Sequence, residues 1–121
     1  MPKRKIYKYQ DFIKYSMTET TVFRDFVGDY PGTRLLEFLI EGRFFDYNLT
    51  DISEKSEVSW RTLNRLWPRL VDNKIVIITR TIGRVKLYKL NMENPSVIKL
   101  VDLFDNLLEQ NVPMKEKAAA W

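Results

Sequence analysis

Apolar residues recur with a helical period near the middle of the chain. Between residues 59 and 72 the apolar positions are Leu63, Leu66, Trp67 and Leu70. This i, i+3, i+4, i+7 spacing predicts an amphipathic helix with one buried face. The opposite, exposed face carries Arg61, Thr62, Asn64, Arg65 and Arg69.

The pattern changes to that of strands directly after this helix. Ile75–Ile78 is a β-branched run typical of a half-buried strand, and Val85–Leu90 predicts the strand that returns. The inward positions of the second strand are Val85, Leu87 and Leu90. Between the strands lies a short basic loop, Arg80-Thr81-Ile82-Gly83-Arg84, in which Gly83 suits a tip that needs a positive φ.

Another amphipathic helix is predicted from Thr33 to Glu41, because leucine and isoleucine form an apolar stripe there. The Thr33 hydroxyl is suited to cap its first backbone N–H groups, and Gly42 supplies a stop. Phe44, Phe45 and Tyr47 follow in a short extended piece that we expect to pair with the hairpin as a third strand.

A second short helix is predicted to begin at Thr50 as its N-cap, with Ile52 pointing inward. Val58 is then the apolar residue of a tight turn, and Ser59 caps the basic helix of residues 59–72. A helix, a short turn and a second helix with an exposed polar face form a helix-turn-helix arrangement.

Proline 68 interrupts the basic helix because proline has no backbone N–H. We expect the helix to kink or restart there. Either the kink lets Arg61 and Arg65 point in a different direction from Arg69, or it has a structural role only.

The two ends of the chain have different characters. Residues 1–8 form a basic arm, which either touches DNA or only solubilises the chain, and an aromatic segment of one or two short helices occupies residues 9–27.

A last helix over residues 95–110 is capped by Asn94 and carries a wide apolar stripe. The stripe indicates a homodimer interface, with a core helix within one chain as the alternative; residues 111–121 are expected to be a disordered tail.

Positive charge is concentrated in two places. The chain carries +4 overall, residues 1–8 contain four basic and no acidic side chains, and residues 57–90 contain eight basic against two acidic ones. The rest of the chain is therefore acidic overall. Two basic segments on such a chain indicate a nucleic-acid partner, or else a solvated basic face.

The amino-acid composition argues against a catalytic or metal-binding function. The 121 residues contain no cysteine and no histidine, so thiolate and imidazole ligands and bases are missing. We predict no catalytic, cofactor or metal site, and no stretch is long and apolar enough for a membrane span. The expected protein is cytoplasmic and nucleoid-associated.

The run LTDISEKSEVSWRTLNRLWPRLVDNKIVIITRTIGRVKLYKLN resembles the winged helix-turn-helix domains of archaeal transcriptional regulators. The preceding FVGDYPGTRLLEFLIEGRFFDYN is similar to the first helix and lead-in strand of that group, so the resemblance covers residues 23 to about 110. It implies an α+β, mainly helical fold with three helices and a small antiparallel β-hairpin wing. The length of the chain predicts one domain, which we expect over residues 9–110. Asn73-Lys74 departs from the family, which often has glycine in that turn.

The resemblance also implies which positions face double-stranded DNA. The third helix, about residues 59–72, would lie in the major groove, and the wing, about residues 79–86, on the backbone or minor groove. The implied contacts are Ser59, Trp60, Arg61, Thr62, Asn64, Arg65, Arg69, Arg80, Thr81, Arg84 and Lys86. Arg61, Thr62 and Arg65, near the helix start, are the best candidates for reading bases.

The predicted function is therefore a homodimeric, sequence-specific DNA-binding regulator and not an enzyme. The dimer would use residues 95–110, and the N-terminal aromatic segment is a further candidate surface for it. Two alternatives stay open: an architectural, partition or replication-associated DNA binder of a plasmid or virus, and a winged helix used for protein–protein contact.

Overall fold

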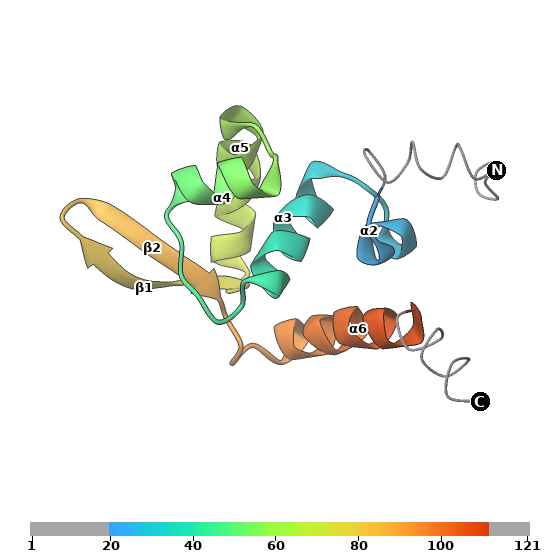
Figure 1. Ribbon diagram of the computed structural model, residues 1–121. Coiled ribbons are helices and arrows are strands. Elements are labelled where there is room, and N and C mark those ends of the chain that lie inside the picture. Colours follow the sequence, from blue (N-terminus) through green and yellow to red (C-terminus); the bar gives the residue numbers. More distant parts are fainter. Residues whose placement is uncertain (1–19, 112–121) are drawn as a thin grey trace.

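The computed structural model describes residues 20–111, in which five helices and one two-stranded sheet are present. The basic arm, residues 9–19 of the aromatic segment and residues 112–121 of the predicted tail lie outside this range. The elements in chain order are α2 (Val22–Val27), α3 (Pro31–Glu41), α4 (Leu49–Ser56), α5 (Trp60–Asp72), β1 (Val76–Ile82), β2 (Val85–Leu90) and α6 (Pro95–Asn111). Figure 1 shows α3, α4 and α5 as a helical body, from which the hairpin projects, while α6 runs past α2 on another side.

The core forms where the apolar stripes of α3 and α5 meet the base of the hairpin. Leu35, Ile40 and Leu63 are fully buried, and Val58 in the turn between α4 and α5 is 4% exposed, as the sequence predicted. The Trp67 ring stands edge-on to Tyr88 of β2, with 5.2 Å between centroids. This packing fixes the rotation of α5 about its own axis, and with it the direction of its polar face.

The apolar stripe of α6 is buried within a single chain. Val97, Val101, Phe104 and Leu107 are 2–6% exposed, and the Phe104 ring lies 5.4 Å from that of Phe23 in α2. The residues on the opposite side of α6 are mostly polar. The stripe thus serves as core, and a dimer through this helix stays a prediction.

Two helices begin at other residues than the sequence suggested. The N-cap of α4 is Asn48 and not Thr50, because the Asn48 side chain accepts the Asp51 N–H at 2.8 Å. The α3 helix begins at Pro31, whose missing N–H costs nothing in a first turn. Thr33 still acts at this end, since its hydroxyl accepts the Tyr30 N–H at 2.9 Å.

The strands differ from the prediction in burial and extent. In β1 only Val76 is buried, while Ile77 and Ile78 are 42% and 50% exposed. Val85, predicted to point inward, is 48% exposed and pairs with Ile82 directly beside the turn of the hairpin. The third strand reduces to one bridge, in which Tyr47 and Tyr88 exchange backbone hydrogen bonds of 2.8 Å.

Two predicted irregularities have different outcomes. The α5 helix continues through Pro68 and does not restart there. The turn after α5 does need a residue with positive φ, and Lys74 takes it with φ of 58°. This left-handed conformation is the reason that glycine would fit there. The Lys74 carbonyl accepts hydrogen bonds from the Asn91 and Asn94 side chains, which fix the strained turn.

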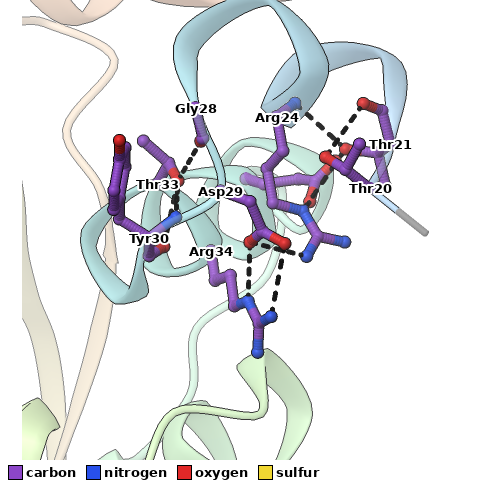
Figure 2. A network of polar contacts seen from close by, with 9 residues as sticks. Thr20, Thr21, Arg24, Gly28, Asp29, Tyr30, Thr33 and Arg34 are labelled. Atoms are coloured by element: carbon purple, nitrogen blue, oxygen red, sulfur yellow. Dashed lines mark hydrogen bonds and ion pairs between the residues drawn. The ribbon is translucent and has the colours of Figure 1, made fainter. Parts of the chain in front are cut away.

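A polar network attaches α2 to α3. Arg24 donates from Nε to Oε1 of Glu37 at 2.7 Å, and the Glu37 side chain is only 8% exposed. Asp29, in the linker between the helices, accepts from Arg34 at 2.8 Å and from Arg24 at 3.3 Å (Figure 2). The hydrogen bond from Arg34 is the main reason that the pKa of Asp29 is lowered. Burial opposes this lowering, and the hydrogen bond from Arg24 adds to it.

Replacing Arg24 with Met should lower the free energy of unfolding by about 3 kcal/mol, because it leaves the buried Glu37 carboxylate without its cation. The double variant Arg24→Met/Glu37→Met should regain most of this loss. Arg34→Met is the matched control: it removes a half-exposed pair and should cost below about 1 kcal/mol. Urea unfolding followed by circular dichroism measures all three; equal losses for Arg24→Met and Arg34→Met would contradict the buried-pair account.

Candidate nucleic-acid interface

The start of α5 is fixed by its cap. Ser59 adopts an extended ψ of 152°, and its Oγ accepts the Thr62 N–H at 3.2 Å. The same Ser59 hydroxyl donates to Oγ1 of Thr62 at 3.0 Å. The cap predicted at Ser59 is therefore present. Thr62 is half-buried, and its hydroxyl is already hydrogen-bonded to Ser59 at the start of the helix.

The exposed face of α5 is basic. Leu63 and Trp67 point into the core, and at 100° per residue the side chains of Arg61 and Arg65 then fall on the opposite side. The exposed residues of this helix up to Arg69 are Trp60, Arg61, Asn64, Arg65, Pro68 and Arg69. Pro68 lies between the arginines on this face.

The three arginines of this face form no ion pair with any residue in the described part of the chain. Arg61, Arg65 and Arg69 follow one another at four-residue intervals along about two turns. Three guanidinium groups that make no ion pair within residues 20–111 form a surface that favours an anionic partner. Each also offers a planar fork of donors that fits guanine O6/N7 or phosphate oxygens.

Asn64 is oriented along the helix in this structure. Its side-chain nitrogen donates to the Trp60 carbonyl at 2.8 Å. Bidentate pairing with adenine needs the amide to face the groove edge-on, with its oxygen accepting and its nitrogen donating. Asn64 would have to leave its bond to Trp60, or share it, to read a base in that way.

Trp60 lies at the corner between α4 and α5. It is 53% exposed and, together with Thr50, Ser53 and Glu54 of α4, lines a shallow hollow of about 340 Å³. At 100° per residue Trp60 lies in line with Leu63, Asn64 and Trp67, so its indole lies beside α4 and not along the arginine face. A flat apolar ring there could contact a thymine methyl group or a deoxyribose.

The wing places its basic residues at its free end. Gly83 takes a φ of 63° at the tip, as predicted, and Thr81, Arg84 and Lys86 are all exposed. A register shift between Ile78 and Arg80 marks a bulge at Thr79. Bulges increase the local twist of a hairpin, and here the bulge turns the side chains that follow it.

Arg80 has an intramolecular partner that the sequence did not reveal. Its guanidinium contacts both carboxylate oxygens of Asp46, at 3.0 and 3.2 Å, and Thr79 donates to the same carboxylate at 2.5 Å. Asp46 thus neutralises one of the predicted wing contacts and ties the bulge to the segment between α3 and α4. A pair of residues 34 positions apart leaves no local signal in the sequence.

The wing and α4 enclose a second hollow, of about 310 Å³. Arg84 and Lys86 line it from the wing, and Asn48, Leu49 and Thr50 line it from the start of α4. The first backbone N–H groups of a helix favour an anion, and two cations face them here. A phosphate group in this hollow would lie near the two cations of the wing and the start of α4. Thr50, which is not the cap, keeps its hydroxyl available at this position.

The predicted residues thus fall into three groups: the arginine face of α5 with Trp60 at its start, the wing tip, and the hollow between wing and α4. Arg80, Thr62 and Asn64 are already bonded within the chain. Within residues 20–111, His, Cys, Asp and Glu side chains do not gather in any group of three or more that could hold a metal ion. None of the helices in that range has the length and apolar character needed to cross a bilayer.

The helical core, the exposed polar third helix and the hairpin define a winged-helix fold, the class that the sequence predicted. Among solved structures the chain is similar to the crystal structure of the AntR antimony-specific transcriptional repressor, with a TM-score of 0.52 and 18% sequence identity. The match covers 91% of this chain and 90% of that chain. A comparison with known protein families finds no match. No curated protein sequence matches the chain either.

The Asp46 carboxyl should titrate at a lower pH than usual, because hydrogen bonds from Arg80, and then Thr79, lower its pKa. The pair is therefore present at neutral pH and is lost only as the pH falls through this lowered pKa. In the Arg80→Gln variant, the titration midpoint of the Asp46 carboxyl should rise toward the ordinary pKa of aspartate. Carbon-detected NMR of the carboxyl group measures both midpoints, and an unchanged midpoint in the variant would refute the pairing.

Proposed function

We propose that this chain is a sequence-specific double-stranded DNA-binding protein that regulates transcription. The observation that carries the proposal is the basic face of α5, where Arg61, Arg65 and Arg69 are exposed and have no ion-pair partner in the described range. An α-helix fits the major groove of B-DNA, and the N-terminal turns of such a helix reach furthest into it. The similarity in fold to a transcriptional repressor supports the same interpretation.

The proposed contacts divide into two kinds. Arg61 and Arg65, near the start of α5, read base edges, and Trp60 contributes an apolar contact beside them. Arg69 binds the phosphate backbone, and so do Arg84 and Lys86 of the wing, where the hollow at the start of α4 would receive a phosphate group. Arg80 has a reduced role in this scheme, because its charge is already balanced by Asp46.

The proposal includes a homodimer and a nucleoid location. Two copies would read two half-sites about one helical turn apart. The resemblance to archaeal regulators supports such an assembly, although the main apolar stripe of α6 is used inside the chain. Antimony is not part of the proposal: soft ions prefer thiolate ligands, and the 121 residues contain no cysteine.

Selection of bound duplexes from a random pool should converge on one consensus sequence. Arg61→Ala should lose about 1–3 kcal/mol of discrimination at one base pair of that consensus, because a bidentate contact to one base disappears. Lys99→Ala, which removes an exposed cation on α6, is the control and should leave the consensus intact. A pool that binds without converging favours the architectural alternative.

Arg84→Ala should weaken binding to all duplexes alike and reduce the slope of log K against log salt by about 1, since one phosphate contact is lost. Fluorescence anisotropy at several salt concentrations measures this slope. If the wild-type chain shows no salt-dependent binding at all, the DNA proposal fails, and the winged helix used for protein–protein contact becomes the better account.

A further inference from the structure

A third hollow lies on the flank of α5, at the edge of the core and beside the arginine face. It has a volume of about 300 Å³ and is formed between the start of α3 and the second half of α5. Its wall is apolar: Leu35, Leu36, Leu66 and Leu70 contribute aliphatic side chains, and the exposed ring of Tyr30 stands at one end. Among its lining residues only Arg69 is charged.

Arg69 therefore belongs to two surfaces. Its side chain is exposed on the basic face of α5, and it also borders the apolar hollow. It makes no ion pair with the described residues, and no acidic side chain lines the hollow. An occupant that satisfies both features has an apolar body and one negatively charged group.

We propose that this hollow binds a small amphipathic carboxylate, with its chain over Leu36, Leu66 and Leu70 and its carboxylate on the Arg69 guanidinium. The volume lies at the lower end for small-molecule sites and suits a chain of about ten carbon atoms. It is too small for a helix of a second copy, which is about 10 Å wide, to enter.

The position of Arg69 gives this site a consequence for DNA, which rests on the function proposed above. The guanidinium that pairs with the carboxylate is the one that we assign to the phosphate backbone. Ligand and duplex therefore compete for the same cation, and the bound ligand lowers the affinity for DNA. The site would act as the effector site of the regulator.

Gly32 offers a way to block the hollow without damaging the fold. It lines the hollow in the first turn of α3, its φ is not positive, and a Cβ built on it meets no atom within 4 Å. Gly32→Leu should therefore be accommodated without a clash, and it adds a bulky side chain to the lining of the hollow. It should also favour the helix, since glycine is a poor helix former.

The test uses decanoate as the probe, with decan-1-ol as its uncharged counterpart, and follows backbone amide NMR shifts of the full chain without DNA. Decanoate should bind with a Kd of about 1 mM or tighter and shift the amides that border the hollow. Arg69→Gln should weaken decanoate about five-fold and leave decan-1-ol unchanged. Arg65→Gln, on the same helix but outside the hollow, is the matched control and should leave both Kd values unchanged. Gly32→Leu should abolish binding of both probes.

The proposal is overturned if decanoate does not bind, if the shifts map to another surface, or if Gly32→Leu binds decanoate like the wild type. It is also overturned if these amides shift with protein concentration alone, because a second copy then covers the hollow. The effect on DNA is measured separately: decanoate should weaken duplex binding by the wild type but not by Gly32→Leu. A chain that binds decanoate here and no duplex would refute the proposed function and leave the ligand site standing.

Discussion

The burial of Leu63 and Trp67 is the constraint on which the rest of the structure depends. These side chains pack α5 against α3 and against Tyr88 at the base of the hairpin. A helix has one rotation about its axis that buries a given stripe, so this packing decides which residues face water. The outward direction of Arg61 and Arg65 is a result of apolar burial and needs no polar contact to hold it.

Local patterns predicted most of the fold. The i, i+3, i+4, i+7 spacing in α5, the cap at Ser59, the buried turn residue Val58 and the wing tip at Gly83 are all present. Each of these depends on residues within a few positions of one another. Errors arose at helix starts, where Thr50 was predicted as the N-cap of α4 and Asn48 is the cap observed. Both residue types can cap a helix, and the two lie only two positions apart.

What the sequence could not reveal depends on distant pairs. Asp46 and Arg80 are separated by 34 positions, and the Arg24–Glu37 pair joins two helices whose relative orientation no periodicity gives. The role of α6 is a similar case: an apolar stripe shows that a face is buried, but it does not say whether the same chain or another copy covers it. Here α2 covers much of it, through Phe23.

The tie between Asp46 and the bulge of the wing has an entropic consequence. A two-stranded hairpin is only marginally stable alone, and a wing that projects from the body would fluctuate among many orientations. Thr79 and Arg80 fasten its middle to the segment before α4. Binding to a surface then needs less loss of conformational freedom, because part of the ordering has already taken place on folding. Asp46 thus neutralises the charge of Arg80 at the interface, and in return the wing is already held in one position before it binds.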